Sequence, residues 1–232
     1  MARVRFFTGG LLLAGKGGET VPYLCGYQGN QAVNDLTGIA AVLQSRAVTL
    51  PAGGDLCSTV AMEVSVGSGS PLLMRYGFGA FRTSGKADQQ LSIFYELING
   101  PGLPGDRELR LLGKPGQAGD FHSYTALFDS TAGQWQFLFD GNLYATSQNP
   151  AWQGREAVLP AFVAQVSVLE APVMGESSAP CNVEACRLQA AGLFTDVDFS
   201  ATSAFTQTAT VGSVTLRDGI TNAFSLAATV TP

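Results

Sequence analysis

The amino-acid sequence predicts an all-β protein, built as two antiparallel sheets that pack into a jelly-roll sandwich. Much of the chain alternates between apolar and other side chains with period two, as in STVAMEVSVG at 58–67. That alternation is typical of a strand with one face in a core. Gly, Pro, Asn and Asp separate the runs, and helical periodicity is nearly absent. We expect one domain over 1–232, because sandwiches of this size form single units.

The N-terminal region offers the first expected strand, Val4–Thr8. Arg3 and Arg5, placed before the apolar run FFTGGLLLAG, imitate a signal peptide. Thr8-Gly9-Gly10 interrupts the run and no Ala-x-Ala site follows it, so a strand of an already mature chain is preferred. No segment approaches the ~18–20 apolar residues that a membrane helix needs.

Residues 35–46, DLTGIAAVLQSR, are the one stretch where two elements compete. Asp35 or Thr37 could cap a short helix, with Ile39 among the residues of its apolar face. Gly38 weakens that helix, and a strand at Ala40–Gln44 is the alternative.

Later strands follow at short intervals and extend to the C-terminus. The β-rich runs, with the turn residues that end some of them, are 58–69, 71–85, 90–100, 107–116, 122–131, 133–141, 142–148, 160–172, 186–199, 209–219 and 222–231. The tail 199–232 is rich in Ala, Thr and Ser, yet it still alternates. We therefore expect it to return as strands of the same domain.

Charge excludes one class of partner. The net charge is −5 and the chain has no basic stripe, so it lacks the phosphate-neutralising surface that nucleic acid binding needs. Anionic membrane surfaces are disfavoured for the same reason. Charged residues make up 13%, about half of the ~25% of typical globular chains, which suits an extracellular or cell-surface β protein.

Four cysteines form an even set with one close pair, CNVEAC. We expect a local Cys181–Cys186 disulfide and a Cys25–Cys57 disulfide that ties the N-terminal segment to the sandwich. Cys-x4-Cys is not a zinc spacing, and the single histidine is distant. The alternative is four buried thiols that behave as small hydrophobes. Disulfides would place the protein in an oxidising compartment.

The segment His122–Gly141 carries a family resemblance. His122-x-Tyr124, then Asp129, Gly133-x-Trp135-x-Phe137 and Asp140-Gly141 describe two strands, a hairpin loop and a tight turn. This string resembles the central hairpin of concanavalin A-like jelly rolls, which include laminin-G-like and legume-lectin-like domains and many glucanases. The resemblance covers 58–171. It implies a fold that hosts lectins, lyases, hydrolases and structural modules.

Catalytic signals are sparse. His122 begins a strand beside a turn and no Gly-x-Ser-x-Gly elbow exists, so we interpret it as structural. Glycoside hydrolysis needs two carboxylates, and Glu96 with Glu63 or Glu170 is the available set. Glu96 lies between apolar residues, which favours a raised pKa.

Binding signals are somewhat richer. Trp152 stands in a loop among amides and an arginine, and aromatic rings beside amides suit sugar. Tyr76, Arg82, Tyr95 and Glu96 are expected to add to a concave binding face. Asp196-x-Asp198 offers two oxygen ligands for Ca²⁺, but the nearby residues add only hydroxyl groups, so a solvated strand face is the preferred interpretation of the pair.

Three functions remain open. The leading hypothesis is a non-catalytic, extracellular module that binds a glycan or surface polysaccharide, or mediates adhesion. The second is a polysaccharide hydrolase or lyase that uses Glu96 with Glu63 or Glu170. The third is a structural subunit of a self-assembling surface layer, because low charge suits a buried interface. The sequence leaves enzymatic activity undecided between them.

Overall fold

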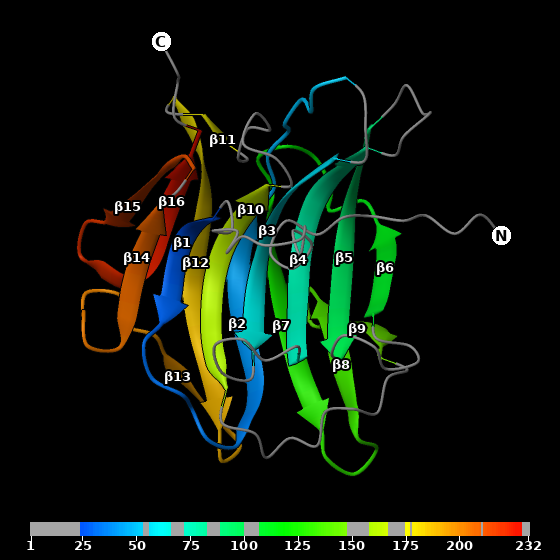
Figure 1. The fold of residues 1–232 in the computed structure, drawn as a ribbon, viewed down its shortest axis with the longest axis vertical. Coiled ribbons are helices and arrows are strands. Elements are labelled where there is room, and N and C mark those ends of the chain that lie inside the picture. The colour runs from blue at the N-terminus through cyan, green and yellow to red at the C-terminus, as the bar shows by residue number, and fades with distance from the viewer. Residues whose placement is uncertain are drawn as a thin grey trace, which may run out of the picture.

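A computed structural model describes residues 24–52, 56–65, 72–82, 89–99, 107–147, 158–166, 175–176, 178–209 and 211–228. Every regular element in these ranges is a strand, and none is a helix that could cross a membrane (Figure 1). The strands are β1 Leu24–Gly29, β2 Leu36–Gln44, β3 Leu56–Ser65, β4 Leu72–Arg82, β5 Gln89–Asn99, β6 Arg107–Gly113, β7 Phe121–Asp129, β8 Gln134–Phe139, β9 Asn142–Thr146, β10 Leu159–Val166, β11 Gly175–Glu176, β12 Ala179–Ala190, β13 Leu193–Asp196, β14 Phe205–Ala209, β15 Ser213–Arg217 and β16 Ile220–Ala227. The expected strand Val4–Thr8 lies outside the described residues.

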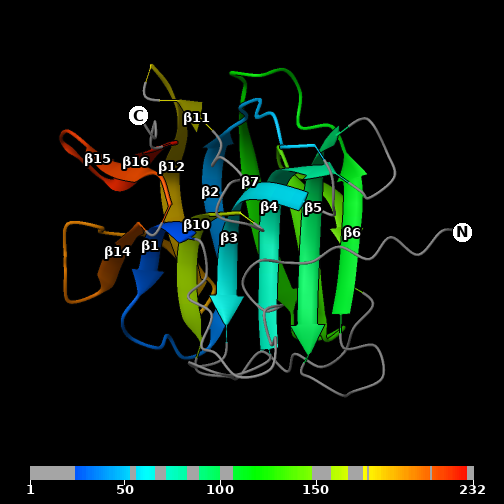
Figure 2. The same cartoon turned by 45° about the horizontal axis from the view of Figure 1, so that its top comes forward.

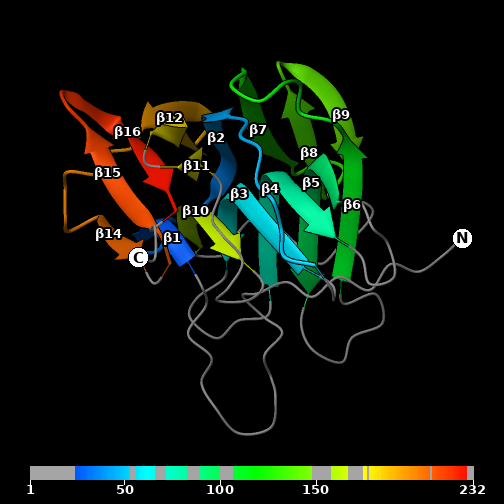
Figure 3. The same ribbon diagram turned by 90° about the horizontal axis from the view of Figure 1, so that it is seen from above.

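Two antiparallel sheets form the sandwich, and they appear as two layers in Figures 2 and 3. One sheet has seven strands in the order β14-β1-β10-β3-β4-β5-β6. The other has nine, with the path β15-β16-β12-β2-β7-β8-β9 and with β11 and β13 paired to β12. The predicted all-β sandwich is confirmed. Strands β14 and β16, from the tail, pair with β1 and β12 respectively.

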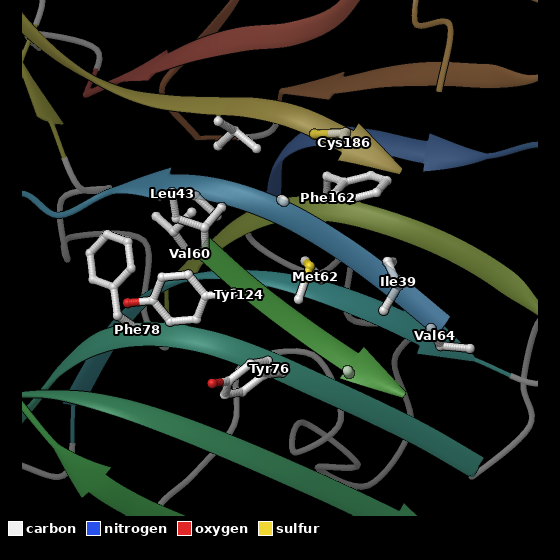
Figure 4. Close-up of a cluster of buried hydrophobic side chains, with 14 of the residues drawn as sticks. Ile39, Leu43, Val60, Met62, Val64, Tyr76, Phe78, Tyr124, Phe162 and Cys186 are labelled. Atoms are coloured by element: carbon white, nitrogen blue, oxygen red, sulfur yellow. The ribbon is translucent and has the colours of Figure 1, made fainter. Parts of the chain in front are cut away.

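The core lies between the sheets and follows from the period-two pattern. Alternate residues of β3 and β4, such as Met62 and Phe78, point inward, where they meet Ile39 and Tyr124 from the opposite sheet (Figure 4). Rings also pack in pairs, with Tyr95 and Phe137 stacked at a centroid separation of 4.2 Å. Residues between the inward ones therefore occupy the outer face of each sheet, which is the face turned away from the partner sheet.

The ambiguous stretch 35–46 forms strand β2, Leu36–Gln44, and the helix is not formed. Ile39, Ala41 and Leu43 alternate into the core, and β2 pairs with β7 on one side and β12 on the other. The strand is in the middle of its sheet, so cross-strand pairing overrides the weak helical pattern.

The structure contradicts both predicted disulfides, since none of the four cysteines is bonded to another. Cys25 lies in the core between the sheets, whereas Cys57 lies on the outer face of the same sheet. The two thiols therefore have the sheet between them. Cys181 and Cys186 are five positions apart along β12, at most about 16 Å of extended chain, with a register shift between Glu184 and Arg187. A disulfide needs Cα atoms within about 7 Å.

Candidate functional site

Three charged residues form a row across the outer face of the seven-stranded sheet. Glu63 of β3 is directly opposite Arg75 of β4, which is directly opposite Glu96 of β5. The antiparallel register therefore places the arginine between two carboxylates. All three are shielded from solvent, with side-chain exposures of 14%, 2% and 0% in that order. Buried charges in such a row need partners, because desolvation alone would cost several kcal/mol for each ion.

Arg75 pairs with both carboxylates of this row. Its Nη1 lies 3.2 Å from Glu96 Oε2 and its Nε lies 3.4 Å from Glu63 Oε2. Its Nη2 donates a hydrogen bond of 2.8 Å to Thr59 Oγ1. The guanidinium carbon is 5.6 Å from the centre of the Phe94 ring, which is a cation–π contact. The guanidinium is thus held by three side chains besides Glu63.

Glycines on β4 allow the Arg75 side chain to extend along the sheet to Thr59. Gly77 and Gly79 follow Arg75 on the same face, and Gly79 is opposite Thr59. A Cβ built on Gly77 would lie 2.1 Å from the carbonyl oxygen of Val60, so the strands approach too closely for any side chain there. The missing side chains leave space above the sheet for Arg75 to extend to Thr59.

Glu63 has a second partner, the amide of Gln165 on β10. Gln165 Nε2 donates to Glu63 Oε2 at 2.9 Å. Burial raises the pKa of Glu63, the nearby Glu96 carboxylate raises it further, and Arg75 and the Gln165 hydrogen bond partly oppose that rise. Glu63 is also the most exposed member of the row. It is therefore the acid in this cluster best placed to exchange a proton.

Two polar atoms beside Glu63 lack hydrogen-bond partners among the described residues. They are Arg75 Nε, whose contact with Glu63 does not meet hydrogen-bond geometry, and Gln165 Oε1. Both side chains are at least nine-tenths buried. An unused donor and an unused acceptor next to an acid with a raised pKa are features of a functional site.

The other residues singled out in the sequence are dispersed. Tyr76 and Tyr95 lie in the core, Tyr76 donating to the Leu138 carbonyl at 3.0 Å and Tyr95 to Glu108 at 2.5 Å (Figure 4 shows Tyr76). Sugar stacking needs an exposed ring face, which neither tyrosine has. Arg82 donates to the Leu50 carbonyl at 3.1 Å. Trp152 and Glu170 lie outside the described residues.

His122 and the Asp196/Asp198 pair have local roles. His122 Nδ1 lies 2.7 Å from Asp140 Oδ2, and the same carboxylate accepts a bond from the Ser123 backbone N–H at 2.9 Å. Asp198 accepts two hydrogen bonds from Ser200, which lower its pKa. Within the described ranges no group of three or more His, Cys, Asp or Glu residues could hold a metal ion. The structure thus adds no further ligand to the expected Ca²⁺ pair.

Sequence reasoning named Glu63 and Glu96 but missed Arg75, Thr59 and Gln165. Arg75 and Gln165 each interrupt an apolar run, MRYGF and FVAQV, and that signal could have marked them. Their contacts, however, join residues 16 to 102 positions apart, which only the sheet register brings together.

Comparison with known proteins supports the fold. No family model matches the sequence, and no curated protein matches it either. Among solved structures, scytalido-glutamic peptidase with a transition state analogue inhibitor has a TM-score of 0.59 at 10% identity, over 90% of this chain and 98% of that one. SCP-B, a member of the eqolisin family of peptidases in complex with the tripeptide Ala-Ile-His, has a TM-score of 0.54 at 8% identity over the same shares. At such identities the likeness shows the fold alone.

A weaker similarity reaches the laminarinase catalytic domain of Thermotoga maritima, with a TM-score of 0.37 at 11% identity, over 62% of this chain and 66% of that one. The chain folds as the two-sheet antiparallel jelly-roll sandwich that the sequence predicted. A fold shared at such low identity does not define a function, because one fold hosts many activities.

Proposed function

We propose that this protein hydrolyses amide bonds of the peptide type, with Glu63 as its acid–base group and Gln165 as the amide beside it. The observation that carries the proposal is the Glu63–Gln165 contact of 2.9 Å, on an acid whose pKa is raised and whose side chain is 14% exposed. A carboxyl group adjusted in this way can accept a proton from water and return it to a leaving amine.

The chemistry would run on two groups. In the first step the ionised Glu63 takes a proton from water as the water oxygen attacks the carbonyl carbon. In the second the same proton passes to the leaving nitrogen as the carbon–nitrogen bond breaks. The Gln165 amide has two N–H bonds and only one binds Glu63, so the other is available to substrate. Side-chain amides of this kind stabilise developing negative charge.

The fold comparison supports the choice of bond. The two peptidase structures cover nearly the whole chain, and one is described as a glutamic peptidase, a name that points to a glutamate in its chemistry. The glycosidase alternative, Glu96 with Glu63, has less support. Such enzymes need room for a sugar or a water between two carboxyl groups. Here the Arg75 guanidinium occupies that position and binds both, and Glu96 has no exposed surface.

The test is cleavage of a mixed library of quenched fluorescent peptides between pH 2.5 and 7.5. Glu63→Gln keeps the shape and the Gln165 contact but removes the proton acceptor, so kcat/KM should fall at least ~100-fold. Glu184→Gln is the matched control, because Glu184 pairs with Arg217 on the other sheet, and it should retain activity. No cleavage by the wild type, or full activity in Glu63→Gln, would refute the proposal.

The glycan-binding hypothesis predicts that Trp152 contributes to a sugar-binding site. A glycan array with the wild type and Trp152→Ala tests it, and loss of binding in the variant would assign a sugar site to that loop. Size-exclusion chromatography with light scattering tests the surface-assembly hypothesis, since a monomer at all concentrations would contradict it. Extracellular placement loses its disulfide argument and rests on low charge alone.

A further inference from the structure

We infer that Arg75 donates its Nε–H to the carbonyl oxygen of the bond being cleaved, and that Glu96 and Thr59 hold the guanidinium in place for this. The inference rests on the proposed hydrolase function and adds an electrophilic group to it. Glu96, expected from the sequence to be the acid, becomes a positioning residue.

The orientation of Arg75 is set by contacts on every side but one. A guanidinium is planar and presents five N–H donors in a rigid fork. Glu96 engages Nη1 at 3.2 Å, Thr59 accepts from Nη2 at 2.8 Å, and the Phe94 ring lies 5.6 Å from the central carbon. Rotation of the plane would break all three contacts together. The Nε edge therefore stays turned toward Glu63.

That edge is where unused donor capacity remains. Arg75 Nε is buried, and it has no hydrogen-bond acceptor among the described residues because its 3.4 Å contact with Glu63 is poorly directed. A buried donor without an acceptor is destabilising, and more so when it is charged, so its retention calls for a role. A base and a donor about 3 Å from one position can serve a single reacting centre.

The bonds and charges balance with water as the co-reactant. Glu63 removes one proton from water while the water oxygen bonds to the carbonyl carbon. The π electrons of the carbonyl move to its oxygen, which gains a negative charge and accepts the Arg75 Nε–H. When the carbonyl reforms, the carbon–nitrogen bond breaks and the nitrogen takes the proton from Glu63. Arg75 stays protonated throughout.

Glu96 has a second effect on this site. With Arg75 it forms a neutral pair, so the cation can act as a donor without fully cancelling the rise in the pKa of Glu63. The described charged groups that face Glu63 are Arg75 and Glu96, and the Gln165 amide is its polar neighbour. Removing the Glu96 charge should therefore lower the pKa of Glu63.

Three variants test the inference through steady-state kinetics on the best peptide substrate. Arg75→Lys keeps the charge but loses the fork, and kcat should fall about 100- to 1000-fold with little change in KM. Thr59→Val loses one orienting acceptor and should lower kcat about tenfold, which keeps the test open if Arg75→Lys fails to fold. Glu96→Gln should move the acidic limb of the pH–rate profile to lower pH.

Arg187→Lys is the matched control, because Arg187 also lies over a ring, Phe194 at 5.4 Å, but on the other sheet. It should keep kcat within twofold. If Glu63→Gln is inactive while Arg75→Lys and Thr59→Val retain wild-type kcat, the inference is overturned and the hydrolase proposal stands. If Glu63→Gln retains activity, or the wild type cleaves nothing, both are overturned.

Discussion

Replacing Arg75 by Met should show how much the row of three buried charges, Glu63, Arg75 and Glu96, contributes to the free energy of unfolding. Arg75 is the one cation in contact with both Glu63 and Glu96 among the described residues, and all three are shielded from water. Met fills part of the side-chain volume but removes the cation that both carboxylates contact. Removing one partner of a buried ion pair costs about 3–5 kcal/mol.

That loss is a large part of the ~5–15 kcal/mol by which a folded protein is stable. With a urea m-value of about 2 kcal/mol/M, the unfolding midpoint should fall by about 1.5–2.5 M at pH 7. The deficit should shrink at pH 4, because protonation neutralises Glu63, whose pKa is raised by burial.

The matched control is the triple variant Glu63→Gln, Arg75→Met, Glu96→Gln, which removes all three charges at once. Neutral groups bear burial far better than unpaired ions, so the triple variant should regain at least about 2 kcal/mol over the single one at pH 7. Urea unfolding followed by tryptophan fluorescence measures both. A single-variant loss below about 1 kcal/mol, or a triple variant no more stable than Arg75→Met, would refute the reasoning.

Three further outcomes follow from the same structure. Because the pKa of Glu63 is raised on folding, the folded state holds its proton more tightly, and wild-type stability should decline as pH rises through that pKa. Thermal melts from pH 4 to 8 should show a flatter decline for Glu63→Gln. An unchanged slope in this variant would contradict the prediction. All four cysteines should react with a thiol reagent after unfolding but hardly at all before it. The reason is that they are buried, and burial raises the pKa of Cys25 and of Cys181 to about 12. Fewer than four reactive thiols in the unfolded chain would support a disulfide after all. Gly77→Ala should lower the free energy of unfolding in urea by about 3 kcal/mol, because the added Cβ would meet the Val60 backbone. Gly133→Asn, at an open turn with a φ of 65°, should lower it by less than about 1 kcal/mol. Equal losses in the two variants would show that crowding is not the cause.

The sequence by itself determined the strands and their two faces. In β3, β4 and β5 the period-two pattern separates alternate residues onto two faces, and the structure buries one set, which includes Met62, Phe78 and Ile93, in the core. Tyr76 and Tyr95, which were expected on a binding face, belong to that buried set. That success has a local cause, since the strand backbone alone turns successive side chains to opposite sides. The hairpin at 122–141 was predictable for the same reason, because its turn residues and both strands are adjacent in the chain.

Tertiary structure decided everything that depends on which strands are neighbours. Residues 36–44 became a strand because β7 and β12 pair with them, and Cys25 and Cys57 remained apart because they face opposite sides of one sheet. The sequence identified Glu63 and Glu96 as candidate acids but did not indicate how their side chains are arranged relative to each other. Only the register put Arg75 between them and brought Gln165 across from β10, because side chains far apart along the chain meet through the pairing order of strands, which no local pattern encodes.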